Sequence, residues 1–236
     1  MSWQEKAKLR AAVEAVKHVK SGHIVGLGSG TTAAYAVRQL GKKVREEGID
    51  VLGVPTSYQA SFLAAEEKIP LTTLNEHPQL DLAIDGADQI NKNLALIKGG
   101  GAALTREKIV GSTAKRFIII ADETKLVSKI GLGYPLPVEV IPFSALSVIK
   151  KLKEFCKSVK VREGTGKVGP ITTDNGGFIL DASFRGIAKP GELEMRIKKI
   201  PGVVECGLFV NLVHMAYLGK KNGEVLKLTK PRRTIS

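Results

Sequence analysis

Two hydrophobic periodicities alternate along the first half of the chain and predict helices and strands in turn. Residues 4–20 carry alanine and valine at helical spacing, which is typical of an amphipathic helix. Short strands are predicted at 23–27, 51–54, 71–74, 82–84 and 116–121, and that at 116–121 is strongly apolar. Segments with helical spacing separate most of these strands. Repeated strand–helix alternation predicts a mostly parallel sheet covered by helices.

A Gly/Pro-rich junction, GLGYPLP at residues 131–137, marks a change of pattern. The elements predicted beyond it are, in order, strand 138–141, helix 143–156, strand 159–162, strand 178–182, a helix from about 190 and strand 203–210. This β-α-β-β-α-β order is the ferredoxin-like arrangement. Two strand-like pieces, at 216–219 and 225–228, can return to the first sheet.

The expected fold is therefore α/β, with a Rossmann-like, mostly parallel sheet flanked by helices and a smaller ferredoxin-like α+β domain inserted into it. The Rossmann-like catalytic domain would comprise residues 1–133 and 211–236, and the small domain residues 134–210. A chain of 236 residues suits one domain that carries a smaller second one.

Composition narrows the class of protein. The longest strongly apolar run, 117–121, is far too short to span a membrane, and the first residues show no signal-peptide pattern. Cys156 and Cys206 are far apart and form no CxxC pair, so neither a zinc site nor a redox motif is indicated. We therefore expect a cytoplasmic protein that has no membrane partner.

The charge of the chain bears on its ligands. A net charge of +13 raises the local concentration of any anion, including phosphate esters and nucleic acid. Aromatic residues make up only 5% of the chain, and no basic run alternates with phenylalanine or tyrosine as a base-stacking surface requires. We therefore expect a small anionic ligand and no nucleic-acid partner.

The stretch 82–110 carries the strongest chemical signal. Its short apolar strand ends in two acids, Asp85 and Asp88, and Lys98 then precedes three consecutive glycines and a helix. Backbone N–H groups at such a turn bind anions, because they are unpaired and lie at the positive end of the helix dipole. The stretch therefore predicts an anion site beside two acids and a lysine.

Glu107 lies in the middle of the apolar stripe of that helix, among Ala103, Val110 and Ala114. Glutamate is rarely buried without a purpose or a partner. Burial also raises a carboxyl pKa toward the range in which it works as a general base near neutral pH. One interpretation is a glutamate neutralised by a nearby lysine or arginine. The adjacent glycine turn, the two acids and Lys98 favour the general base.

A second strand-to-helix turn, Gly-Ser-Gly-Thr-Thr at 28–32, adds hydroxyl groups to the backbone donors of a helix N-terminus. A dinucleotide site is the obvious alternative. However, Thr31 stands where the fingerprint requires its third glycine, and the strand at 51–54 ends without an acid for a ribose hydroxyl. A single phosphate group fits this turn better than a nicotinamide cofactor.

Sheets of this kind bind ligands beyond the carboxyl ends of their strands. Both turns, the two acids, Lys98 and Lys125 follow strands, so they can converge although they are scattered in the sequence. The four histidines show no metal-ligand spacing, and Ser29 has no elbow motif or paired histidine. With metal, nicotinamide and covalent catalysis unsupported, the remaining groups suit proton transfer next to a carbonyl in a sugar phosphate.

Several motifs resemble those of type A ribose-5-phosphate isomerases: GLGSGTTA (26–33), DGADQIN (85–91), KGGGAALTREKIV (98–110), ADETK (121–125) and PLPVEVIP (135–142). The similarity runs in order across nearly the whole chain and includes PGVVECGLF (201–209). The long lysine–glycine block is highly specific, whereas the first motif alone is weak. The resemblance implies interconversion of ribose 5-phosphate and ribulose 5-phosphate, no metal or other cofactor, and a homodimer or homotetramer.

The resemblance also assigns residues. Glu107 matches the family's catalytic base, and Asp85, Asp88 and Lys98 are the other catalytic residues that it implies. The implied substrate-binding residues are Lys8, Ser29, Gly30, Thr31, Thr32, Asp85, Gly86, Ala87, Asp88, Lys98, Gly99, Gly100, Gly101 and Lys125. Lys8 is a weaker match. The loop SGTT departs from the family's frequent TGST but keeps hydroxyl groups at the same positions.

The implied mechanism begins with the phosphate in the donor-rich turns. An acid of the Asp85/Asp88 pair assists opening of the furanose ring, and Glu107 moves a proton between C2 and C1 through an enediolate. Lys98 and the following backbone amides stabilise the oxyanion. Two alternatives stay open, an amino-sugar phosphate deaminase-isomerase of related fold and a non-catalytic sugar-phosphate sensor.

Overall fold

A six-stranded sheet is the largest element of the structure, a computed structural model that describes residues 1–166 and 168–230. Its strands are β1 (His23–Leu27), β2 (Val51–Pro55), β3 (Leu82–Asp85), β6 (Phe117–Asp122), β12 (Met215–Gly219) and β13 (Val225–Thr229). The order is β13-β12-β6-β3-β1-β2, and every neighbouring pair is parallel except β12 with β13. The last two strands therefore return to the first sheet, as predicted.

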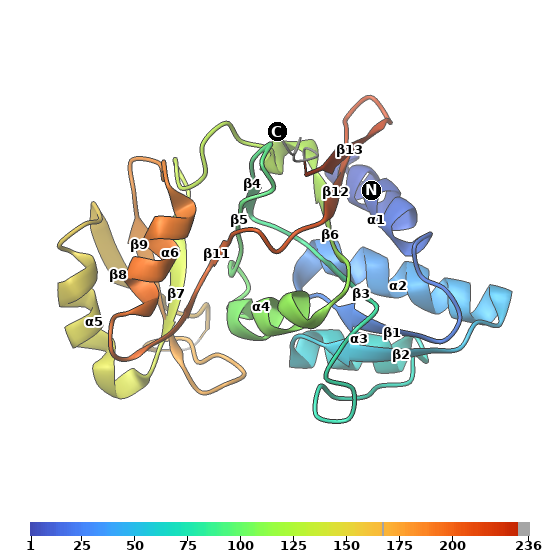
Figure 1. Cartoon of the computed structure of the whole chain (residues 1–236), viewed down its shortest axis with the longest axis horizontal. Helices are drawn as coiled ribbons and strands as arrows, with labels where there is room; N and C mark the ends of the chain where they lie inside the picture. The colour runs from blue at the N-terminus through green and yellow to red at the C-terminus, as the bar shows by residue number, and fades with distance from the viewer. Residues whose placement is uncertain (167, 231–236) are drawn as a thin grey trace, which may run out of the picture.

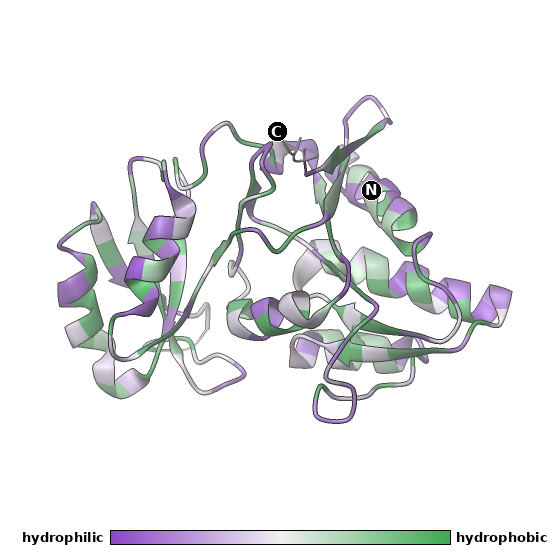
Figure 2. Ribbon diagram, viewed as in Figure 1, coloured by the Kyte–Doolittle hydropathy of each residue, from purple (hydrophilic) through white to green (hydrophobic). Residues whose placement is uncertain are grey.

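Hydrophobic cores lie on both faces of this sheet. The helices packed around it are α1 (Trp3–Val16), α2 (Gly30–Glu47), α3 (Tyr58–Glu66) and α4 (Leu104–Thr113). Successive side chains of a strand point to opposite faces. Accordingly, Ile118 of β6 belongs to the core of α1 and α2, whereas the next residue, Ile119, belongs to the core that contains Val110 of α4. Burial on both faces explains the continuous apolar run of β6, and the strands are mostly green in Figure 2.

The second large sheet is antiparallel and has a hydrophobic core of its own. Its strands are β7 (Leu136–Val140), β8 (Ser158–Val161), β9 (Phe178–Ser183) and β10 (Val203–Cys206). The order β10-β7-β9-β8, with helices α5 (Ala145–Leu152) and α6 (Pro190–Lys198), is the predicted ferredoxin-like arrangement. Val138 of β7, Leu152 of α5 and Ile197 of α6 are fully buried in its core. The expected fold class is confirmed.

A small third sheet, which the sequence did not predict, lies between the two larger ones (Figure 1). It consists of β4 (Gln89–Ile90), β5 (Leu96–Ile97) and β11 (Leu208–Phe209). The single strand predicted at 203–210 is therefore wrong, because the chain leaves the antiparallel sheet after Cys206 and pairs with β5 instead. This third sheet places the stretch 82–110 between the two large sheets.

Two other boundaries differ from the prediction. Within the described residues, 71–74 forms no strand, since Leu71 makes only an isolated bridge to Gly53. The first helix ends at Val16 rather than near residue 20, because the amides of His18 and Val19 bond back by three residues instead of four.

Two further observations concern the surroundings of the protein. In the part of the chain that the structure describes, no helix combines the length and the apolar character needed to cross a membrane. Cys156 and Cys206 are both free thiols.

Candidate active site

A cavity of about 400 Å³ lies at the carboxyl ends of the parallel strands. Its wall comes from the segments that follow β1, β2, β3 and β6, from the glycine turn before α4, and from residues 172–174. This is where an open α/β sheet binds its ligand. The cavity is therefore the candidate active site.

Nearly all of the predicted site residues meet at this cavity. Those in its wall are Lys8, Ser29, Gly30, Thr31, Thr32, Gly86, Ala87, Asp88, Lys98, Gly99, Gly100, Gly101, Glu107 and Lys125. Asp85 is the exception, because it lies behind the wall with only 2% of its surface exposed. The convergence expected from the ends of the strands is therefore observed.

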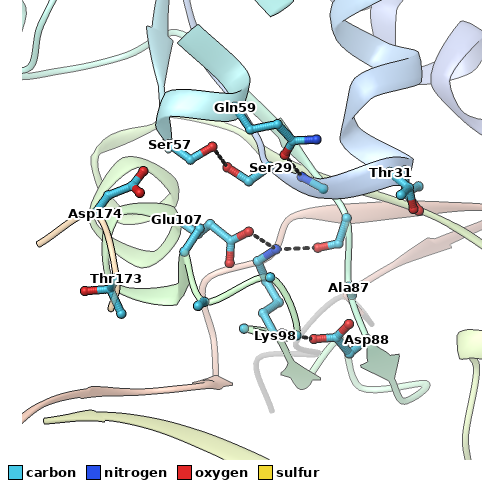
Figure 3. Close-up of a pocket in the computed structure, with 18 of the residues that line it drawn as sticks. Ser29, Thr31, Ser57, Gln59, Ala87, Asp88, Lys98, Glu107, Thr173 and Asp174 are labelled. Carbon is cyan, nitrogen blue, oxygen red and sulfur yellow. Dashed lines mark hydrogen bonds and ion pairs between the residues drawn. The ribbon is translucent and has the colours of Figure 1, made fainter. Parts of the chain in front are cut away.

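Lys98 occupies the centre of the site (Figure 3). Its Nζ donates a hydrogen bond of 2.6 Å to the carbonyl oxygen of Gly86. The same atom lies 3.1 Å from Oδ2 of Asp85 and 3.3 Å from Oε1 of Glu107. All three charged side chains are buried, so one cation faces two carboxyl groups with little screening by water.

Glu107 is presented to the cavity by the first turn of α4. Its Oε2 is buried and has no hydrogen-bond partner among the described residues. Burial, and after it the negative charge of Asp85, raises the pKa of Glu107 to about 8, although Lys98 opposes the shift. The lysine therefore neutralises this glutamate only in part, and one carboxyl oxygen stays free to accept a proton.

Asp85, the last residue of β3, lies behind the cavity wall and contacts both Lys98 and the Gly-Ser-Gly-Thr-Thr turn at residues 28–32. Its Oδ1 accepts hydrogen bonds from the amides of Gly86 (2.7 Å) and Ser29 (3.2 Å). A Cβ on Gly28 would overlap the Asp85 carboxyl group, which explains the glycine at that position. Burial raises the pKa of Asp85 even though Lys98 lies beside it. Asp85 thus connects the turn at residues 28–32 to Lys98.

The charge state of Lys98 follows from its two acidic neighbours. Burial alone would lower the pKa of Lys98, but the adjacent carboxyl groups of Asp85 and Glu107 more than offset this effect and raise it. Lys98 therefore stays cationic at neutral pH, which suits it to stabilise a developing negative charge in the cavity.

The glycine turn is held from both sides. On one side, Oδ2 of Asp88 accepts a hydrogen bond of 2.8 Å from the amide of Gly100. On the other, Nη1 of Arg162 donates to the carbonyl oxygens of Gly99 (2.7 Å) and Gly100 (3.0 Å). Asp181 fixes the guanidinium through a second pair of hydrogen bonds. Gly99 has a φ of +105°, a conformation that favours glycine.

Hydroxyl groups hold the turn at residues 28–32 in place. Ser29 Oγ lies 2.7 Å from Thr56 Oγ1 and donates a 2.5 Å hydrogen bond to Ser57 Oγ. The Gly30 amide donates to Oε1 of Gln59 at 2.7 Å. These contacts fix the turn at residues 28–32 to the segment that follows β2.

The first turn of α2 faces the cavity beside two lysines. Thr31 and Thr32 belong to this turn and line the cavity together with Lys8 and Lys125. Lys8 Nζ approaches Thr31 Oγ1 to 3.5 Å. A helix N-terminus and nearby cations are the usual components of a phosphate site.

The cavity wall also contains residues that the sequence analysis missed: Ser57, Gln59, Ala102, Ala103, Thr172, Thr173 and Asp174. Ser57 and Gln59 follow β2, so the rule about strand ends applies to them too. Residues 172–174 belong to an irregular segment between β8 and β9, and no local pattern marks them.

The family of the chain follows from comparison with known proteins. The model of the family "Ribose 5-phosphate isomerase A (phosphoriboisomerase A)" matches residues 52–223. The chain belongs to this family. Ribose-5-phosphate isomerase A of Methanothermobacter thermautotrophicus is 52% identical over 92% of this chain and 95% of its own length. The protein of the same name from Methanosarcina acetivorans is 49% identical over 95% of each chain.

Solved structures of family members share the fold. A structure of D-ribose-5-phosphate isomerase in complex with phospho-erythronic acid is 44% identical, with a TM-score of 0.93 over 97% of this chain and 100% of that one. The ribose 5-phosphate isomerase A of Methanocaldococcus jannaschii is 48% identical, with a TM-score of 0.90 over 94% and 98%. The chain is an isomerase, and the interconversion of ribose 5-phosphate and ribulose 5-phosphate implied by its motifs is confirmed. The two alternative functions are not favoured.

The raised pKa of Glu107 predicts that Glu107→Gln stabilises the folded protein in a pH-dependent way. The folded state holds a proton on Glu107 up to about pH 8, whereas the unfolded carboxyl loses it near 4.5. The parent therefore loses stability as pH rises between these values, and the uncharged glutamine does not. The variant should exceed the parent by at least about 1 kcal/mol at pH 8.5 and by much less at pH 5.

Urea unfolding at the two pH values measures this difference. Glu66→Gln, at an exposed position of α3, serves as the matched control and should leave the difference near zero. A Glu107→Gln variant whose advantage is the same at both pH values would contradict the assigned pKa.

Proposed function

We propose that the isomerisation proceeds by proton transfer between C2 and C1 through an enediolate, with Glu107 as the base. The observation that carries this proposal is the carboxyl group of Glu107. One oxygen lies 3.3 Å from Lys98 Nζ, and the other is buried in the cavity wall without a partner in the described part of the chain. A base with a pKa near the working pH transfers protons most effectively.

The phosphate group of the substrate is assigned to the first turn of α2. The hydroxyl groups of Thr31 and Thr32, the helix N-terminus, and the ammonium groups of Lys8 and Lys125 supply donors and positive charge there. Held at this end, the sugar carbons extend toward Glu107. Binding energy from the phosphate then positions the reacting carbons.

The acid that assists ring opening is assigned to Asp88 rather than Asp85. Asp88 lies in the cavity wall, whereas Asp85 lies behind it and serves as the counter-charge of Lys98. Negative charge then develops on the substrate oxygens as Glu107 removes the C2 proton. The Lys98 ammonium group and the amides of the glycine turn, residues 99–101, are placed to stabilise this charge.

We also propose that the protein is cytoplasmic and forms a homodimer or homotetramer. Three large apolar side chains are exposed within six residues of sequence, namely Ile141 (53%), Phe143 (100%) and Leu146 (80%). Clustered exposed hydrophobic residues are typical of protein interfaces. The two free cysteines support a reducing compartment.

If Glu107 is the base, then Glu107→Gln keeps the shape of the side chain but removes its ability to accept a proton. Its kcat should fall by about 10²–10⁴-fold while KM changes little. In the parent, kcat/KM should rise with pH up to about 8, because only the ionised carboxylate accepts a proton. Steady-state assays from pH 5 to 9 test both statements. Activity within a few-fold of the parent would remove Glu107 from this role.

Solvent exchange distinguishes proton transfer from direct hydride transfer. A carboxylate that lifts a proton from C2 and returns it to C1 can exchange it with water in between, whereas a metal-assisted hydride shift carries the hydrogen directly. Isomerisation of ribose 5-phosphate in D₂O should therefore place deuterium at C1 of ribulose 5-phosphate, partly or fully, as measured by NMR. Product free of deuterium, with later exchange excluded, would overturn the mechanism.

Self-association through the exposed apolar cluster is testable by size-exclusion chromatography with light scattering. The parent should have the mass of a dimer or tetramer. Changing Phe143 and Leu146 together to serine should reduce that mass by about half or more, because most of the apolar contact is lost. Phe62→Ser, at a position of α3 that is 70% exposed, is the control and should leave the mass unchanged. A monomeric parent would refute the proposal.

A further inference from the structure

One part of the cavity wall has no role in the mechanism described so far. Residues 172–177, here called the wall hairpin, lie between β8 and β9, and residues 172–174 line the cavity together with Glu107. In Figure 3, Thr173 and Asp174 lie on one side of Glu107 and Lys98, and Thr31 lies on the other. The wall hairpin therefore stands at the end of the cavity opposite the first turn of α2.

The wall hairpin is tightly closed by its own hydrogen bonds. The amide of Thr173 donates to the carbonyl oxygen of Gly177 at 2.9 Å, and the amide of Gly176 donates to the carbonyl oxygen of Thr173, also at 2.9 Å. Thr173 Oγ1 accepts a further bond of 3.0 Å from the Gly177 amide. Gly176 has a φ of +80°, as such a tight turn requires. These bonds give the hairpin a defined shape.

Glu139 anchors the wall hairpin to the helix that carries the base. This glutamate of β7 is fully buried and takes no part in the proposed proton transfer. It accepts hydrogen bonds from Thr173 Oγ1 (2.6 Å) and Asn175 Nδ2 (3.3 Å) in the hairpin. It also accepts one from Thr105 Oγ1, two residues before Glu107 on α4. Glu139 therefore fixes the position of the wall hairpin relative to the helical turn that carries Glu107.

A second set of contacts fixes the other side of the wall hairpin. Arg106 of α4 donates to Oδ1 of Asn175 at 2.7 Å and to the carbonyl oxygen of Asp174 at 2.8 Å. The amide of Tyr58, the first residue of α3, donates to Oδ2 of Asp174 at 2.8 Å. The wall hairpin is thus bound to α3 and α4, which pack on the six-stranded sheet. It forms a fixed wall at this end of the cavity.

We propose that the wall hairpin is a length gauge that selects five-carbon over six-carbon aldose phosphates, with Asp174 as the residue that sets the limit. The proposal rests on the proposed function, since it takes the phosphate group to lie at the first turn of α2. Because the phosphate group is fixed at one end of the cavity and the wall hairpin closes the other, the cavity accommodates a sugar chain of only one length. An extra carbon must displace the phosphate or push against the wall, and discrimination by one carbon is typically about 10–200-fold.

The test compares kcat/KM for ribose 5-phosphate and for D-allose 6-phosphate, which has one more carbon, in the parent and in two variants. Asp174→Ser shortens the side chain and lengthens the cavity, so the ratio of the two values should fall by about 10-fold or more. Asp174→Asn keeps the size of the side chain and an oxygen acceptor for the Tyr58 amide, so its ratio should stay within about threefold of the parent.

A merely structural role gives a different result. If the contact between Asp174 and Tyr58 only stabilises the fold, Asp174→Ser lowers both kcat/KM values together and leaves their ratio unchanged, which overturns the gauge. A fall in the ratio for Asp174→Asn equal to that for Asp174→Ser also overturns it, because side-chain length would not be the cause.

A binding series in the parent protein keeps the proposal testable if Asp174→Ser does not fold. Isothermal titration with phosphorylated aldonic acids of four, five and six carbons should show affinity falling by at least about 10-fold between five and six carbons. Equal affinity for these two would overturn the gauge. A parent that binds this series selectively, while Glu107→Gln keeps nearly full activity, would refute the assigned base and leave the gauge standing.

Discussion

The buried ammonium group of Lys98 is the interaction on which the site depends. A charged group taken out of water is costly unless it is paired and hydrogen-bonded, and Lys98 meets this requirement through Asp85, Glu107 and the carbonyl oxygen of Gly86. These partners come from β3, from α4 and from the loop after β3. The same contacts that make a buried lysine tolerable therefore bring the ends of separate elements together. Asp85 and Glu107 share this one cation, so burial and the negative charge of Asp85 raise the pKa of Glu107 although Lys98 lies beside it.

The small third sheet holds Lys98 in place. Lys98 directly follows β5, and its amide donates to the carbonyl oxygen of Gly207 at 2.9 Å. A Cβ on Gly207 would overlap the carbonyl oxygen of Lys98, so this close approach requires glycine. The Lys98 Nζ also lies 5.6 Å from the centre of the Phe209 ring in β11. The lysine is therefore fixed at its backbone and at its side chain by a segment that runs between the two large sheets.

The sequence predicts much of this structure because the signals involved are local. Most of the parallel strands contain a short apolar run, as in FIIIA of β6, and the residues that follow such runs converge by topology alone. The third sheet escapes prediction, because strands of two residues have no periodicity to detect. The position of Asp85 behind the wall and that of residues 172–174 within it depend on tertiary packing. In the predicted strand at 71–74, Leu-Thr-Thr-Leu, only Leu71 makes a bridge to the sheet, at Gly53.

The block Thr105-Arg106-Glu107-Lys108 shows how one helical turn serves both stability and chemistry. Thr105 bonds to Glu139 and Arg106 bonds to the wall hairpin, while Lys108 bonds to Glu194 of α6 (2.6 Å) and Glu205 of β10 (2.8 Å). Only Glu107 points to the cavity with an oxygen that lacks a partner in the described residues. Burying such a group destabilises the fold, and its three neighbours in sequence contribute the polar contacts that hold the turn in place. Each of the four positions has its own partner, so the chemistry of the base and the packing of the antiparallel sheet constrain the same few residues.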